Sequence, residues 1–99
     1  MPKKPRLTLD EHTEMGRVLA GIRDELAHRA VQLDKAYPSS GPEGVPHKKV
    51  GAALRALDEA RSALEILLSR ERPDAAEGTV YYPYPEDRSV VITADRPAS

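Results

Sequence analysis

Residues 8–38 read TLDEHTEMGRVLAGIRDELAHRAVQLDKAYP, and this stretch predicts a long helix over residues 8–37. Thr8 and Glu11 have the spacing of a capping box, in which each side chain satisfies a backbone N–H that the helix leaves unpaired. Large apolar side chains then recur at steps of four, three, four and seven residues, which places them on one helix face. They are Met15, Leu19, Ile22, Leu26 and Leu33. Tyr37 ends the helix, because a residue that precedes proline is disfavoured in the helical conformation.

A loop rich in proline, serine and glycine follows, and a second helix is predicted over residues 46–72. Pro46 suits the first helical position, and Pro73 stops the helix. The main apolar row of this helix consists of Val50, Leu54, Leu57, Leu64 and Leu68, with Ala53, Ala60 and Leu67 beside it. A short loop between two helices of matched length predicts an antiparallel helical hairpin.

Two helices cannot surround a core by themselves, so the apolar stripes need a second layer. We expect two hairpins to pair as a homodimer, which gives a dimeric four-helix bundle. The alternative is that the C-terminal segment covers the hairpin. The expected oligomer interface consists of Met15, Leu19, Ile22, Leu26, Leu33, Leu54, Leu57, Leu64, Leu67 and Leu68.

Two glycines lie inside the first predicted helix. Gly16 and Gly21 each cost the helix about 0.5–1 kcal/mol relative to alanine. One interpretation is a slightly loose helix. The other is close approach of a partner helix, which Gly16 and Ala20, four residues apart on one face, would permit.

The chain outside the two helices divides by composition. Two β-prone runs, Thr79–Pro85 and Arg88–Thr93, flank the polar pair Glu86-Asp87 and predict an extended segment or a small β-hairpin over residues 79–93. Pro83 and Pro85 restrict the first run to an edge strand or an irregular extension. The remaining parts are a flexible basic arm (1–7), a linker (73–78) and a disordered tail (94–99).

Three of the four aromatic residues gather in the first β-prone run, at Tyr81, Tyr82 and Tyr84. Tyrosine is enriched where binding energy concentrates, and the interleaved prolines favour an extended shape. One hypothesis is therefore a docking segment for a partner protein. The alternative is that the rings cover the open face of the hairpin.

Composition limits the chemistry of these 99 residues. There is no cysteine, which excludes disulfides, thiolate zinc sites and a cysteine nucleophile. His12 and His47 would lie some 35 Å apart in the hairpin, and no histidine pair has the spacing of a helical zinc site. No nucleophile elbow or phosphate-binding loop occurs. We therefore expect no metal, no cofactor and no enzymatic activity.

Two basic clusters stand out against a formal charge of −1, with 15 Lys and Arg against 16 Asp and Glu. Lys3, Lys4 and Arg6 lie in the arm, whereas Lys48 and Lys49 begin the second helix, where amide donors and lysines together favour an anion or phosphate. The near-neutral charge argues against nucleic acid as the main partner, and so does the loop over residues 38–46, which with nine residues and three prolines does not fit the turn of about three or four residues in a helix-turn-helix.

No run of eighteen apolar residues occurs, and no apolar run follows the basic arm, so we expect a soluble cytoplasmic protein without a membrane span. The favoured function is a non-enzymatic helical module for protein–protein interaction, which acts by oligomerisation or as an adaptor. One alternative is a small regulatory protein that contacts nucleic acid or phosphate through the two basic clusters. A ligand-binding bundle or an enzyme is the remaining alternative.

Overall fold

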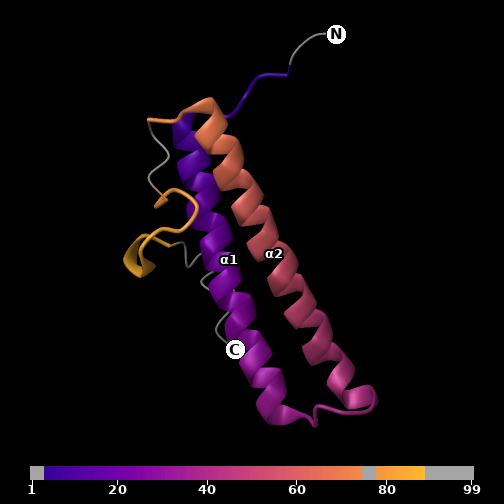
Figure 1. Ribbon diagram of the computed structural model, residues 1–99. Coiled ribbons are helices and arrows are strands. Elements are labelled where there is room, and N and C mark those ends of the chain that lie inside the picture. The colour runs from indigo at the N-terminus through magenta and orange to yellow at the C-terminus, as the bar shows by residue number, and fades with distance from the viewer. Residues whose placement is uncertain (1–3, 75–77, 89–99) are drawn as a thin grey trace.

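The structure, a computed structural model, describes residues 4–74 and 78–88 of the chain. Two long helices, α1 (Leu9–Ala36) and α2 (Val45–Glu71), run antiparallel and pack against each other (Figure 1). Two short 3-10 helices accompany them, η1 (Pro42–Gly44) in the loop and η2 (Pro85–Asp87) near the C-terminus. The predicted helical hairpin is confirmed, and each end of the two long helices lies within one residue of the expected position.

Local interactions explain where α1 begins and ends. The Glu11 amide donates to Thr8 Oγ1 at 3.1 Å, and the Thr8 amide donates to Glu11 Oε1 at 2.8 Å, so the capping box is present. At the other end, Tyr37 is extended, and its amide donates to the Leu33 carbonyl at 3.0 Å. These contacts satisfy backbone groups that a helix end leaves unpaired.

The turn between the helices depends on two glycines. Gly41 has a φ of 74°, a conformation that side chains with a Cβ rarely adopt. Gly44 is buried, and a Cβ there would lie 2.5 Å from the Ser39 carbonyl oxygen. The chain therefore folds back tightly enough for α2 to begin beside the end of α1.

Residues 78–88 lie along one side of the hairpin, against α1 (Figure 1). Their backbone is irregular and ends in η2, so the first strand of the expected β-hairpin is absent from this part of the chain. The physical reason is that arginine side chains, instead of a second strand, hydrogen-bond the carbonyls of Tyr81 and Pro83, and that Pro83 has no amide to donate. Residues 89–93, which carry most of the second expected strand, lie outside the described residues.

The interior is small. Ala20, Leu68 and Tyr81 are fully buried, together with His12. Of the apolar residues expected at an oligomer interface, Leu68 is buried, Met15 and Leu67 are exposed, and the others are half-buried. The half-buried ones are Leu19, Ile22, Leu26, Leu33, Leu54, Leu57 and Leu64. The C-terminal segment therefore supplies part of the second layer that the hairpin needs.

In the described part of the chain, neither helix has a stretch apolar enough and long enough to cross a membrane.

Candidate functional site

Residues 80 and 81 approach α1 closely at a position that has no side chain. A Cβ on Gly16 would lie 1.8 Å from the Val80 carbonyl oxygen and 3.2 Å from Tyr81 Cα. Gly16 is buried, so the glycine in this helix is required by close backbone approach. The approaching backbone is that of the C-terminal segment and not that of a second helix. We call the surface formed by His12 and Gly16 of α1 and Arg61 of α2 the docking slot.

His12 forms one end of the docking slot and is fully buried. Its Nδ1 lies 2.5 Å from the Tyr81 hydroxyl oxygen, and its Nε2 lies 3.1 Å from Glu71 Oε1. A carboxylate only accepts hydrogen bonds, so a neutral imidazole carries its proton on Nε2 and accepts at Nδ1 from the Tyr81 hydroxyl. The contact joins α1, the end of α2 and the C-terminal segment.

The environment of Tyr81 favours the protonated phenol. Burial raises the pKa of Tyr81 above its ordinary value of 10.0, and the negative charges of Glu65 and then Glu71 raise it further. Tyr81 is thus held as a hydrogen-bond donor toward His12. Glu65 Oε1 is itself buried and has no hydrogen-bond partner among the described residues.

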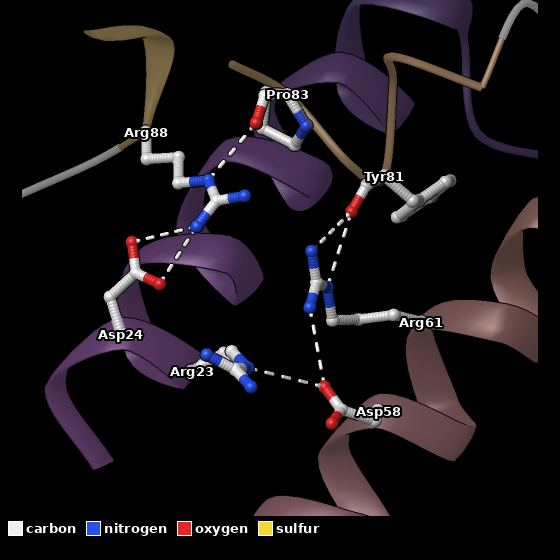
Figure 2. A network of polar contacts seen from close by, with 7 residues as sticks. All are labelled: Arg23, Asp24, Asp58, Arg61, Tyr81, Pro83 and Arg88. Carbon is white, nitrogen blue, oxygen red and sulfur yellow. Dashed lines mark hydrogen bonds and ion pairs between the residues drawn. The ribbon is translucent and has the colours of Figure 1, made fainter. Parts of the chain in front are cut away.

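Arg61 forms the other end of the docking slot and is 4% exposed. Its Nε and Nη2 donate to the Tyr81 carbonyl oxygen at 3.2 and 2.9 Å, and its Nη1 donates to Asp58 Oδ1 at 3.3 Å (Figure 2). The guanidinium also lies 4.5 Å from the centre of the Tyr82 ring. Arg23 of α1 reaches the same Asp58 oxygen at 3.6 Å. A buried charge without such partners would be costly, and here Nε, Nη1 and Nη2 all donate hydrogen bonds while the group also lies over the Tyr82 ring.

The far end of the C-terminal segment is held by a second arginine. Arg88 donates to both carboxylate oxygens of Asp24 at 2.8 and 3.0 Å and to the Pro83 carbonyl at 3.0 Å (Figure 2). Arg17 Nε donates to the Asp87 carbonyl at 3.1 Å. The bonds of Asp24 and Arg17 link α1 to residues 87 and 88, and the bond from Arg88 to Pro83 lies within the segment. The segment is therefore held at its far end as well as in the docking slot.

The three tyrosines of the expected docking segment have different positions. Tyr81 is buried in the docking slot, where its ring covers the hairpin as in the second of the two interpretations above. In this arrangement Tyr81 is not accessible to a partner. Tyr82 and Tyr84 are 41% and 61% exposed. Beside Tyr84, a cavity of about 310 Å³ lies between α1 and the segment, with Arg17 and Val80 among its lining residues.

The two basic clusters lie at opposite ends of the hairpin (Figure 1). Lys4 and Arg6 precede α1, whereas Lys48 and Lys49 are exposed in the first turns of α2. Arg6 is 3.9 Å from Glu71, and Lys3 lies outside the described residues. The hairpin therefore does not combine the clusters into one anion site.

The docking slot was not anticipated from the sequence, although two signals for it were present. Arg61 takes a position within the apolar row of α2, between Leu57 and Leu64. His12 and Gly16 are four residues apart and hence on one face of α1. His12 is nevertheless polar, and it is buried because the C-terminal segment covers it.

No family model matches this chain, and no curated protein or solved structure shows significant similarity to it. Within residues 4–74 and 78–88, no three His, Asp or Glu side chains gather closely enough to hold a metal ion. The docking slot and the apolar surface that the segment leaves uncovered are therefore the two features of this chain that suggest a function.

Proposed function

We propose that this protein is a non-enzymatic interaction module that self-associates through the apolar surface that residues 78–88 leave uncovered. The observation that carries the proposal is the exposure of large apolar side chains on both helices. Met15 on α1 is 38% exposed, and Ile66 and Leu67 on α2 are 53% and 43% exposed. In a small hairpin, apolar surface of this kind is typical of a protein contact.

The uncovered surface of α1 lies away from the docking slot. Val18 is about 160° from Gly16 around the helix at 3.6 residues per turn. Leu7, Met15 and Val18 line an apolar depression of about 340 Å³, with Glu11 and Glu14 at its border. Burial of apolar area gains about 25 cal/mol per Å², so a partner seated here would be stabilised.

The uncovered surface of α2 is formed mainly by small side chains. Exposed residues recur at steps of three and four, which places them on one helix face. They are Ala53, Ala56, Ala60, Ala63 and Leu67. Small side chains allow two helices to approach closely, so this face is suited to packing against a helix of a second hairpin.

The exposed rings of Tyr82 and Tyr84 offer a second contact for the same module. Both project from the C-terminal segment, whose backbone is anchored by Arg61 and Arg88. Aromatic side chains on an anchored backbone provide contact area with little loss of conformational entropy. We therefore propose them as a second contact surface, separate from the apolar surfaces of α1 and α2.

Sedimentation velocity at micromolar concentration tests the proposal. The wild-type chain should sediment as a dimer, whereas Met15→Lys and Leu67→Lys should shift it toward the monomer with unchanged helical circular dichroism. Ser40→Lys adds the same charge at an exposed position in the loop between the two helices, outside the proposed surface, and should leave the dimer intact. A folded wild-type chain that remains monomeric up to high micromolar concentration would contradict self-association.

A further inference from the structure

The C-terminal segment is attached to the hairpin in the way that a short peptide ligand is attached to a receptor. Tyr81 and Pro83 are buried, and the remaining side chains of residues 78–88 are half-buried or exposed. The attachment consists of discrete contacts: the Tyr81 hydroxyl with His12, the Tyr81 carbonyl with Arg61, and the Val80 backbone over Gly16. Arg88 adds an ion pair at the far end.

We propose that the docking slot accepts residues 78–88 of a second copy of this chain in place of its own, so that two hairpins are joined by exchange of this segment. The proposal rests on the self-association proposed above and names its mechanism. Each attachment contact joins a hairpin residue to a segment residue. Docking between two chains can therefore reproduce the same contacts with the same geometry.

The chain is long enough for exchange. Glu71, the last residue of α2, contacts His12, so α2 ends beside the docking slot. The stretch from Arg72 to Val80 can span at most about 27 Å at about 3.4 Å per residue. In the proposed dimer each docking slot faces away from the partner, so the segment must pass about two helix diameters, about 20–24 Å, to reach the docking slot of the other hairpin, which this span allows.

The chemistry of the docking slot selects this segment over an arbitrary apolar surface. His12 Nδ1 needs a donor, and the guanidinium of Arg61 needs an acceptor, because both side chains are buried. Tyr81 supplies a hydroxyl and a backbone carbonyl at the matching positions, and the backbone of Val80 lies directly over Gly16, which has no side chain to obstruct it. A second copy carries the one segment that this structure shows to fit.

Two full-length variants test the proposal by complementation. Gly16→Ala closes the docking slot but leaves residues 78–88 unchanged. Tyr81→Ala leaves the docking slot intact but removes the ring and the hydroxyl that fill it. When the two variants are mixed in equal amounts, native mass spectrometry should detect a heterodimer at least ten times more abundant than in the control mixture.

The control mixture combines Gly16→Ala with the double variant Gly16→Ala/Tyr81→Ala, and therefore contains no intact docking slot. Gly51→Ala is the matched control for the glycine change, since its Cβ would meet only Arg55 Nη1, at 3.8 Å. A mixture of Gly51→Ala and Tyr81→Ala should contain as much heterodimer as a mixture of wild type and Tyr81→Ala. Helical circular dichroism establishes that each variant is folded.

A synthetic peptide of residues 78–88 keeps the test decisive if the Gly16→Ala variant does not fold. The peptide should bind the full-length Tyr81→Ala chain, and its own Tyr81→Ala version should bind at least ten times more weakly. Equal heterodimer in the test and control mixtures, or equal binding of the two peptides, would overturn the exchange. Homodimers of Gly16→Ala and of Tyr81→Ala would show that the apolar surface associates by itself. Together with equal heterodimer in the test and control mixtures, they would support the proposed self-association and overturn the exchange.

Discussion

His12 Nδ1 lies 2.5 Å from the hydroxyl oxygen of Tyr81, although the two residues are 69 positions apart in the chain. Glu71 of α2 binds the other nitrogen of the same imidazole at 3.1 Å. A single buried histidine thus connects the beginning of α1, the end of α2 and the C-terminal segment. Because all three pieces meet there, a change at Tyr81 affects the hairpin as well as its cover.

Removal of the Tyr81 hydroxyl should destabilise the protein. Tyr81→Phe leaves buried His12 Nδ1 without its donor, which should cost about 1–3 kcal/mol in the free energy of unfolding. Tyr81→Ala also removes the ring and should cost about 3–5 kcal/mol. Urea denaturation measures both values. Tyr84→Phe is the control, because that ring is exposed, and a loss as large as that of Tyr81→Phe would contradict a specific role for the His12 contact.

Loss of the Arg61 guanidinium should release the Tyr81 backbone. Arg61→Met keeps an aliphatic stem of similar length but leaves the buried Tyr81 carbonyl without either of its two donors. Hydrogen bonds to charged groups contribute about 1.5–3 kcal/mol, and a loss of that size is expected in the free energy of unfolding. Arg55→Met, at an exposed position of α2, should change it by less than about 0.5 kcal/mol. Equal effects at the two positions would exclude Arg61 as an anchor of the segment.

Two glycine-to-alanine substitutions should change the free energy of unfolding in opposite directions. Alanine favours a helix over glycine by about 0.5–1 kcal/mol, so Gly51→Ala should raise the free energy of unfolding by that amount. At Gly16 the new Cβ would lie 1.8 Å from the Val80 carbonyl oxygen, and the overlap should outweigh the propensity gain by about 1–3 kcal/mol. Thermal unfolding distinguishes the two variants. Stabilisation by Gly16→Ala would show that the segment does not depend on the docking slot.

Stability should fall in alkaline solution because of Tyr81. Its pKa is raised in the folded state by burial and by Glu65 and Glu71, whereas in the unfolded chain it stays near 10. The contribution is complete below about pH 10, where the phenol is neutral in both states, and is lost as the pH rises from there through the folded-state pKa. Urea denaturation at pH 8 and near pH 11 should therefore show a larger loss for wild type than for Tyr81→Phe. The same loss in both proteins would assign the effect to other groups.

The two long helices could be predicted from the sequence because their determinants are local. Thr8 and Glu11 are three residues apart, Tyr37 precedes Pro38, and the leucine rows repeat at helical spacing. Helix ends that are set by neighbours in sequence need no knowledge of the rest of the chain. The antiparallel pairing followed from the short loop, whose tight turn is made by Gly41 and Gly44.

The candidate site could not be predicted in the same way. Close approach of a partner helix was one of two interpretations of Gly16, the other being a slightly loose helix, and the backbone of Val80 lies there instead. The tyrosine run favoured a strand on local propensity, whereas Arg61 and Arg88 bind its carbonyls and hold it in an irregular path. Strand preference depends on which partner is available, and the partner is a property of the tertiary structure.

Local sequence patterns therefore specify the helices, their ends, the hairpin and the need for a second layer over its apolar rows. The folded chain adds which segment supplies part of that layer, and it explains the positions of His12, Gly16 and Arg61. The two kinds of information differ in the distance along the chain over which the interactions act. Capping and helical periodicity act over three or four residues, whereas the burial of Tyr81 between His12 and Arg61 brings together groups that are distant in the chain.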